Sequence, residues 1–407
     1  MQKKLLAVAV AGALAAPGLA MAQSSVTISG ILKGSFDSAS IGNANTGRTG
    51  NLSELRISDH SSRIIFNMTE DLGGGMKAIG QFDLRFNLDQ TSRLQNDFSA
   101  ASGTSTGTIS PTVNPVSSGN NHVGLAGNFG SVKLGRQDIY YIDSPSVLPA
   151  SAHIGTTQQP VFHSLASMNS SRTPNLVWYE SPRISGIKGL VAYSTNPTRA
   201  SGTNEAENGL GTNSRSGNAV HIRLDADIGN ANIVYSMVNA KSDYIGGTMS
   251  VTASGSNDTT NNATANQKGS TLYGTYNFGG GLKAGVGYSS ERTQTVSTGS
   301  GSDAKAGMAS IAYTTGAHTI GGEMARRGNL STSGNTVASS DAKLTSLVYD
   351  YAFSKRTNLG LTYSTIKNGS AAAITPFYQG NNAFGGQFTG LNGEKYTLTG
   401  VVLRHAF

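Results

Sequence analysis

Apolar and polar residues alternate along most of the chain, and the pattern is clearest between residues 62 and 89. After a glycine-rich turn at residues 70–75, every second residue from Met76 to Leu88 is apolar or small. The positions between them are mostly polar and include Lys77, Asp83 and Arg85. Because successive side chains of a strand point to opposite faces, this stretch predicts an antiparallel hairpin with one apolar and one polar face.

The same alternation predicts sixteen strands. They cover residues 25–37, 54–70, 75–89, 119–128, 130–136, 173–181, 186–194, 217–227, 230–241, 268–278, 281–292, 304–314, 317–327, 341–353, 356–367 and 394–407. Seven short turns and eight long polar loops alternate between these strands, so all the long loops lie at one end. This segregation predicts an all-β protein, a sixteen-stranded antiparallel transmembrane β-barrel, rather than a soluble sandwich. An even strand number also brings the first strand beside the last, which closes the sheet.

The composition limits the kinds of structure with which such a chain spans a membrane. It has 52 glycines, no cysteine and 13% charged residues, against about 25% in soluble domains. After residue 22 there is no run of the ~18 apolar residues that a membrane-spanning helix requires. Since only helices and closed barrels satisfy their backbone groups in lipid, a membrane location requires the barrel.

The first 22 residues have the three parts of a secretory signal peptide. Lys3 and Lys4 precede an apolar run at residues 5–16, and the small-x-small sequence at 20–22 predicts cleavage before Gln23. We therefore expect export of the chain, with residues 23–407 forming one barrel domain.

Several stretches together resemble a known family. They are SVTISG at 25–30, SR at 62–63, TEDLGGGMKA at 69–78, VGLAGNFGSVKLGR at 123–136, NLVWYESP at 175–182 and RHAF at 404–407. With them, the chain resembles the Gram-negative general porins, especially the neisserial and beta-proteobacterial type. The resemblance implies a homotrimer of sixteen-stranded barrels in the cell outer membrane. It also implies that the third long loop folds into the lumen as a constriction.

That loop is the connection at residues 137–172. It holds its own apolar residues, Val147, Leu148, Val161, Phe162 and Leu165, which are able to pack on the barrel wall. A long loop with hydrophobic anchors is usually ordered and functional. We therefore predict that it is the constriction loop.

The alternation places Lys33, Arg63, Lys77 and Arg85 on the inward, polar face. In the resembled family, wall arginines face the constriction loop, and Arg63 and Arg172 match two of those positions. The candidate constriction and selectivity residues are Lys33, Arg63, Lys77, Asp83, Arg85, Asp138, Asp143 and Arg172.

The chain departs from the family pattern at three places. Asn120-Asn121-His122 stands where relatives have an arginine, Lys33 where an aspartate is common, and Arg85 where an acid is frequent. The balance remains positive, which predicts a weak preference for anions. For each single charge, a solvated lumen face without a selective role is an equal alternative.

Other chemistries find little support. The seven histidines are scattered without the paired spacing of a zinc site, and no thiol is available. The glycine runs lie at turns between strands, not before helices as phosphate loops require. There is also no basic patch interleaved with aromatic residues of the kind that binds single-stranded nucleic acid. We expect no cofactor, no metal, no nucleic-acid partner and no enzymatic activity.

The expected function is passive diffusion of small hydrophilic solutes and ions through a water-filled outer-membrane channel. The expected partners are two further copies of the chain, the lipid bilayer and lipopolysaccharide. Two alternatives stay open at this point. One is a substrate-selective porin with a saturable site, and the other is a surface adhesin or barrel hydrolase whose lumen is closed.

Overall fold

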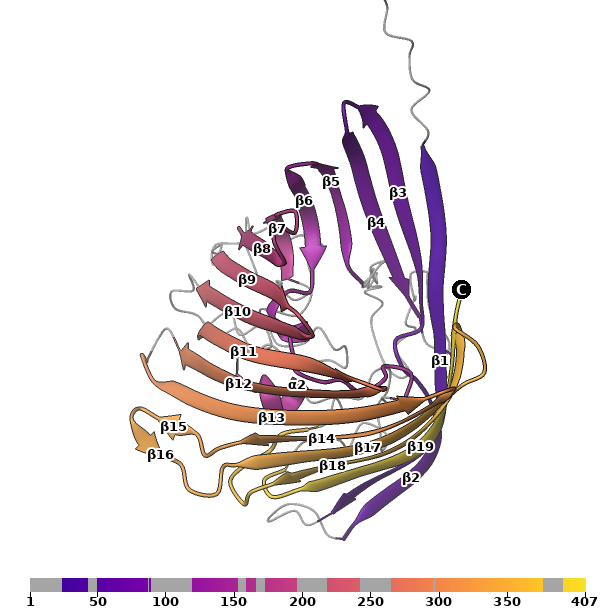
Figure 1. The fold of residues 1–407 in the computed structure, drawn as a ribbon. Helices are drawn as coiled ribbons and strands as arrows, with labels where there is room; N and C mark the ends of the chain where they lie inside the picture. Colours follow the sequence, from indigo (N-terminus) through magenta and orange to yellow (C-terminus); the bar gives the residue numbers. More distant parts are fainter. Residues whose placement is uncertain are drawn as a thin grey trace, which may run out of the picture.

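The computed structural model describes residues 24–42, 50–86, 88, 119–152, 159–165, 173–195, 218–241, 265–295, 298–375 and 391–407. The strands in these ranges form one antiparallel sheet that closes on itself (Figure 1). They are β1 (Ser25–Gly42), β2 (Leu52–Asp59), β3 (Arg63–Gly73), β4 (Met76–Arg85), β5 (Asn121–Gly127), β6 (Gly130–Gln137), β7 (Thr173–Glu180), β8 (Ile187–Ser194), β9 (Asn218–Ile228), β10 (Ala231–Lys241), β11 (Ala265–Gly279), β12 (Leu282–Thr295), β13 (Gly301–Thr315), β14 (His318–Arg327), β15 (Ser331–Thr332), β16 (Asn335–Thr336), β17 (Ala342–Ala352), β18 (Thr357–Asn368) and β19 (Lys395–Ala406).

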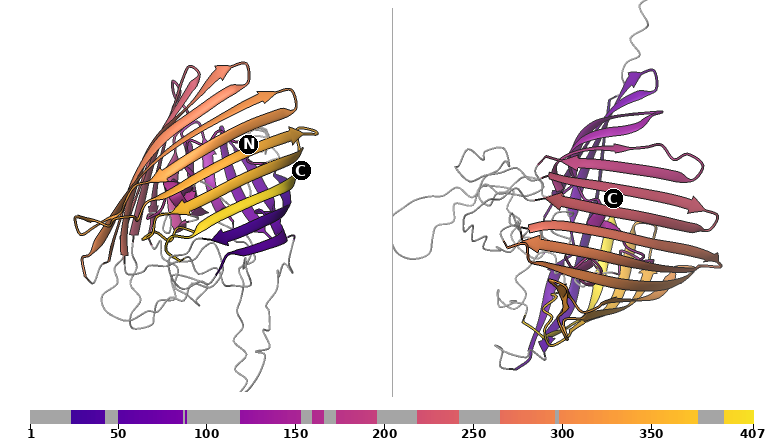
Figure 2. Two further views of the ribbon diagram at one scale, coloured as in Figure 1. Left: turned by 90° about the horizontal axis from the view of Figure 1, so that it is seen from below. Right: turned by 90° about the vertical axis from the view of Figure 1, so that its left-hand side faces the viewer.

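The nineteen labelled strands of the described ranges make sixteen barrel positions. β2 and β3 share one position, because β1 pairs with β3 along its first half and with β2 along its second half. β15 and β16 form a small hairpin beside β13 and are not part of the ring. Figure 2 shows the remaining strands side by side around the ring and inclined to its axis. The predicted sixteen-stranded antiparallel barrel is therefore confirmed.

The ring closes between β1 and β19. Their register runs from Ile31 opposite Ala406 to Gly42 opposite Lys395. At the end of this seam Gly30 and Phe407 exchange two backbone hydrogen bonds, of 3.0 and 3.1 Å. A Cβ atom at Gly30 would lie 2.4 Å from the Phe407 ring and 2.5 Å from a backbone oxygen of β3, so only glycine fits there.

Some boundaries differ from the prediction. β3 continues through Gly73, so the predicted six-residue turn shrinks to Gly74 and Gly75, which both have positive φ and form a two-residue hairpin turn. β1 extends to Gly42, beyond the predicted end at residue 37, because its last residues pair with β2 and β19. The predicted loop at 293–303 is shorter in the structure, because β12 extends to Thr295 and β13 begins at Gly301.

The two faces of the sheet separate as the alternation predicts. On β13, for example, Ala306, Met308, Ser310 and Ala312 are buried, whereas Ile311 and Tyr313 are about half exposed. Exposed aromatic side chains of the outward face gather near the short turns, at Tyr276, Phe278, Tyr313 and Phe353. A second set, Tyr193, Tyr288 and Tyr363, lies farther along the strands toward the long loops. Two aromatic girdles around an apolar band are typical of outer-membrane barrels.

Helices contribute little to the part of the chain that the structure describes. None of them is long and apolar enough to cross a membrane. The candidate functional site is therefore built from strand residues and from the segment that follows β6.

Candidate lumen constriction

The segment after β6 runs along the inward face of the barrel. Its described residues are 138–152 and 159–165, and they include the short helices η1 (Tyr140–Ile142) and α2 (Gln159–Phe162). Its contacts follow the strands in order, from β9 and β11 near Asp143 to β1 near Ala150. The segment thus covers one half of the wall.

Glu291 on β12 is the main polar anchor of this segment. Its carboxylate accepts hydrogen bonds from the Tyr140 hydroxyl at 3.1 Å and the Leu165 backbone N–H at 2.6 Å. The Nδ1 atom of His163 lies 3.1 Å from the same carboxylate. Glu291 and His163 are almost fully buried. Burial and the neighbouring Glu291 carboxylate raise the pKa of Tyr140, so its hydroxyl stays protonated and donates.

A second group of contacts holds residues 143–150. The Asp143 carboxylate accepts from Arg223 Nε at 3.0 Å. The Ser146 hydroxyl donates to Glu323 on β14 at 2.6 Å, and Lys33 Nζ donates to the Ala150 carbonyl at 2.6 Å. These contacts join the segment to strands around half of the ring.

Apolar side chains complete the docking. Val161 and Phe162 belong to a buried cluster with residues of β1, β13, β14, β17, β18 and β19. Leu148 and Ala152 pack with Ala312 and Val348 in a second cluster. Because buried apolar area contributes ~25 cal/mol per Å², these contacts stabilise the docked position of the segment together with its hydrogen bonds.

Inward-facing glycines of the wall provide the space in which the segment lies. A Cβ atom at Gly285 would be 2.0 Å from the Pro145 carbonyl oxygen, and one at Gly321 would be 2.5 Å from Leu148 Cδ2. A Cβ atom at Gly360 would be 2.8 Å from the Cα atom of Ala152. The segment therefore packs directly against the backbone of β12, β14 and β18.

The opposite wall has a cluster of two arginines and one acid. Asp83 is buried, and its Oδ2 atom accepts from Arg85 Nη2 at 3.1 Å and lies 4.0 Å from Arg63 Nη1. Arg63 and Arg85 stand directly opposite each other in the β3–β4 register. Among the described side chains, this cluster thus places two cations beside one carboxylate.

The remaining predicted site residues lie elsewhere. Lys33 and Asp143 are buried, and each makes the contact with its own partner that is described above. Lys77 is exposed beside the short turn, opposite Asp71 in the register. The backbone N–H of Asp138 donates to Asn120 Oδ1 at 3.1 Å. Arg172 lies outside the described residues.

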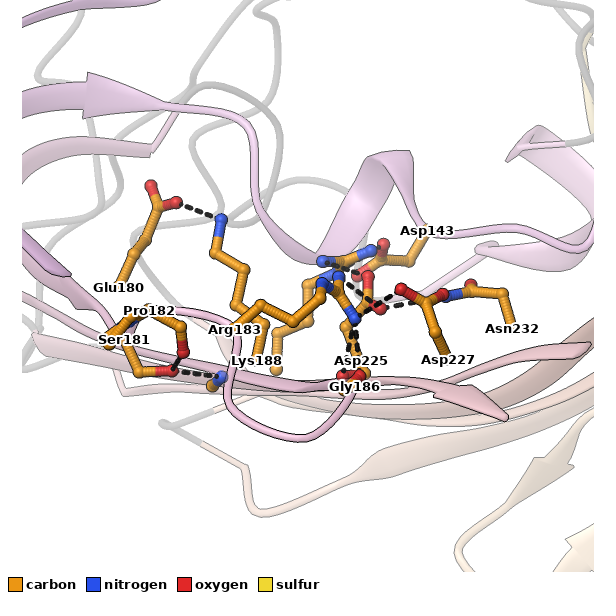
Figure 3. A network of polar contacts seen from close by, with 12 residues as sticks. Asp143, Glu180, Ser181, Pro182, Arg183, Gly186, Lys188, Asp225, Asp227 and Asn232 are labelled. Atoms are coloured by element: carbon orange, nitrogen blue, oxygen red, sulfur yellow. Dashed lines mark hydrogen bonds and ion pairs between the residues drawn. The ribbon is translucent and has the colours of Figure 1, made fainter. Parts of the chain in front are cut away.

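A further ionic network lies near the short turns (Figure 3). Arg183 in the β7–β8 turn pairs with Asp225 and Asp227, both at 2.8 Å. Arg223 joins Asp225, at 3.1 Å, to Asp143 of the loop. Beside them, Glu180 accepts from Lys133 and Lys188, each at 2.7 Å. Cations and acids nearly balance in this network.

The sequence prediction did not include Glu291, Arg223, Glu323 or Arg183. Alternation was able to place Glu291 on the inward face, because it lies on the same side of β12 as Ser289 and opposite Tyr288. Its partners, however, lie 126 to 151 residues away along the chain. Local pattern gives no signal for such pairings.

Comparison with known proteins gives consistent matches. The family described as Gram-negative porin matches residues 7–371. The outer membrane porin protein 32 of Delftia acidovorans is 33% identical over 210 residues, which are 50% of this chain and 52% of that protein. The match thus spans about half the length of this curated relative.

Among solved structures, an anion-selective porin from Comamonas acidovorans has a TM-score of 0.64 at 21% identity, covering 95% of this chain and 100% of that chain. The trimer form of OmpT, an outer membrane protein of Vibrio cholerae, has a TM-score of 0.59 at 13% identity, covering 94% and 99%. At these identities the likeness concerns the fold.

Proposed function

Because the chain belongs to the Gram-negative porin family, we propose that it forms a water-filled channel in the outer membrane for passive diffusion of small hydrophilic solutes and ions. One observation carries the proposal: a closed barrel has a polar inward face, and the segment after β6 lies against half of that face. The open path then runs between this segment and the wall that contains Arg63 and Arg85.

The mechanism is physical. A polar solute that enters hydrocarbon loses its hydrogen bonds to water, which costs several kcal/mol per group. A hydrated lumen removes this cost. The docked segment sets the size limit as the constriction loop, and the wall charges bias the passage of ions.

The proposed ion preference is weakly anionic. It rests on the Arg63–Asp83–Arg85 cluster, in which two arginines lie beside one carboxylate on the wall across from the docked segment. The fold neighbour described as an anion-selective porin supports this reading. We further propose that the protein works as a homotrimer, as the trimer form of another fold neighbour suggests.

A planar-bilayer experiment tests the proposal. Refolded protein is expected to give large open conductance steps, and a KCl gradient is expected to give a zero-current potential of the sign set by chloride. A cation-signed potential would contradict the charge argument but keep the channel. If folded protein gives no steps, the channel proposal fails and a closed-lumen adhesin or hydrolase is favoured.

A substrate-selective porin is a second candidate, favoured by one observation. A cavity of about 470 Å³ lies between residues 146–148 and the short-turn ends of β9–β12, and its lining includes Asp227, Asn232 and Lys283. Such a mixture of donors and acceptors is suited to a polar solute. Flux that saturates with solute concentration would support this candidate, whereas flux that rises linearly would exclude it.

The Arg85→Gln variant is expected to lower the chloride preference. One unit charge 4 Å away contributes ~1 kcal/mol in water, favourable for chloride and unfavourable for potassium, so its loss lowers the chloride-to-potassium permeability ratio by up to ~30-fold at low salt. Glutamine keeps a donor for Asp83, and Arg63 remains beside it. The zero-current potential in dilute KCl measures the ratio, and Lys355→Gln at the β17–β18 turn is the control. An unchanged ratio in Arg85→Gln would show that this cluster does not set selectivity.

A further inference from the structure

The cavity between the loop and the short-turn ends of β9–β12 contains one lysine side chain, that of Lys283 on β12. Gly285, two residues farther along this strand, packs against Pro145 of the loop, so Lys283 lies on the same inward face. Among the residues that the structure describes, the Lys283 ammonium group forms no ion pair or hydrogen bond. The cavity therefore offers this ammonium group to a ligand.

Asn277 on β11 lies beside Lys283. The two residues stand directly opposite each other in the strand register, and both line the cavity. Side chains in this position have Cβ atoms ~5 Å apart. The Asn277 Oδ1 atom accepts from the Gly279 backbone N–H at 3.1 Å, which leaves the Nδ2 group to donate. An ammonium group and an amide N–H group side by side are suited to one carboxylate.

The other end of the cavity contains an acid that is already paired. Asp227 on β9 pairs with Arg183 at 2.8 Å and accepts from Asn232 Nδ2 at 2.8 Å (Figure 3). β9 and β12 are three strand spacings apart in the sheet, or ~14 Å. A ligand with one carboxylate at Lys283 therefore needs an uncharged group at the Asp227 end, because a second carboxylate would meet a like charge there.

The lining between these two ends supplies partners for hydroxyl groups. Asn232 donates its amide hydrogens to two neighbouring carboxylates, so its Oδ1 atom is suited to accept from a ligand. Thr275 stands opposite Asn232 in the register and adds a hydroxyl group. Val147 and Leu148 of the loop form an apolar side of the cavity. A chain of hydroxylated carbon atoms matches all of these groups.

We propose that this cavity binds a small monocarboxylate with hydroxyl groups, the chemical class of the sugar acids. The carboxylate accepts hydrogen bonds from Lys283 and Asn277, and the hydroxyl groups face Thr275 and Asn232. The cavity volume of about 470 Å³ lies within the range of ~300–1,000 Å³ that is usual for small-molecule sites. The inference rests on the second candidate function above, a channel with a saturable site, and names its substrate class.

Binding of three related solutes to the refolded protein in detergent tests the proposal and requires no open pore. Gluconate has one carboxylate, glucose has none and glucarate has two. Saturation-transfer NMR is expected to show saturable binding of gluconate and weaker binding of the other two. Lys283→Gln should bind gluconate about tenfold more weakly, because a hydrogen bond between charged groups is lost. The Lys355→Gln control, at the β17–β18 turn, should bind gluconate as the wild type does.

Asn277→Asp supplies a second and more conservative variant. Aspartate keeps the acceptor for the Gly279 N–H and offers its other oxygen to Lys283, so it should compete with the ligand and abolish gluconate binding. The proposal is wrong if either Lys283→Gln or Asn277→Asp binds gluconate as tightly as the wild type. It is also wrong if glucose or glucarate binds as tightly as gluconate.

Planar-bilayer recording distinguishes failure of this inference from failure of the channel proposal. If both are correct, gluconate should reduce the open-channel current of the wild type in a saturable manner, and Lys283→Gln should weaken this block. Conductance steps from a protein that does not bind gluconate would refute the site alone. Gluconate binding by a folded protein that gives no steps would refute the channel and leave the site in place.

Discussion

Replacement of Glu291 by alanine is expected to release the loop from the wall and raise the single-channel conductance. The carboxylate meets Tyr140, His163 and the Leu165 N–H inside a buried site. Hydrogen bonds to a charged group contribute ~1.5–3 kcal/mol each, so their combined loss is on the order of 5 kcal/mol of docking free energy. A change of that size shifts the docking equilibrium toward the undocked state by a factor of ~5,000.

Conductance and the size limit for neutral sugars measure this release. Glu323→Ala is a suitable comparison, because Glu323 has one hydrogen bond to the loop, from Ser146, among those described above. Its effect on conductance should be smaller. Equal effects in the two variants, or unchanged conductance in Glu291→Ala, would show that Glu291 does not hold the loop.

Replacement of Gly285 by valine is expected to act in the opposite direction and lower the conductance. Its Cβ atom would lie 2.0 Å from the Pro145 carbonyl oxygen, so the loop has to move away from the wall into the open path. Overpacking of this kind costs ~1–3 kcal/mol, which the many remaining loop contacts can bear. The barrel should therefore stay folded with a narrower lumen.

Gly307→Val is the control for this experiment. Gly307 lies on the adjacent strand β13, and its Cβ atom would meet only the Gly287 carbonyl oxygen, at 4.0 Å. Conductance of the control should match the wild type. The double variant Gly285→Val, Glu291→Ala should behave like Glu291→Ala alone, because an undocked loop no longer meets the valine. A further fall in conductance in the double variant would contradict the steric argument.

Much of the fold follows from local sequence, because one face of every strand meets lipid. Each inward cation placed in lipid costs ~2–4 kcal/mol, so the alternation fixes which residues face the lumen. The predicted strand at 230–241, for example, differs from β10 by one residue. The break between β2 and β3 had no such signal. It depends on β1, which changes its partner from β3 to β2 there.

The candidate site was less predictable. Alternation predicts which face of the sheet a residue occupies, but not how far along the barrel axis it lies or which segment packs over it. Lys77 and Arg85 share one face of β4, yet Arg85 meets Asp83 and Lys77 lies beside the turn. Lys33 faces inward as predicted, but the loop covers it at Ala150. The cover of Lys33 depends on a contact between residues 117 positions apart in the chain, for which local sequence gives no signal.

The seam between β1 and β19 has a consequence for biogenesis. The strands that close the ring are separated by the whole of the intervening barrel, so the sheet has no complete hydrogen-bonded form until β19 has been exported. Before that step β1 and β18 are free edges, which lipid tolerates poorly and which attract other chains. Closure therefore acts as a proofreading step: a polypeptide that stops before β19 should remain in the periplasm, available to chaperones and proteases.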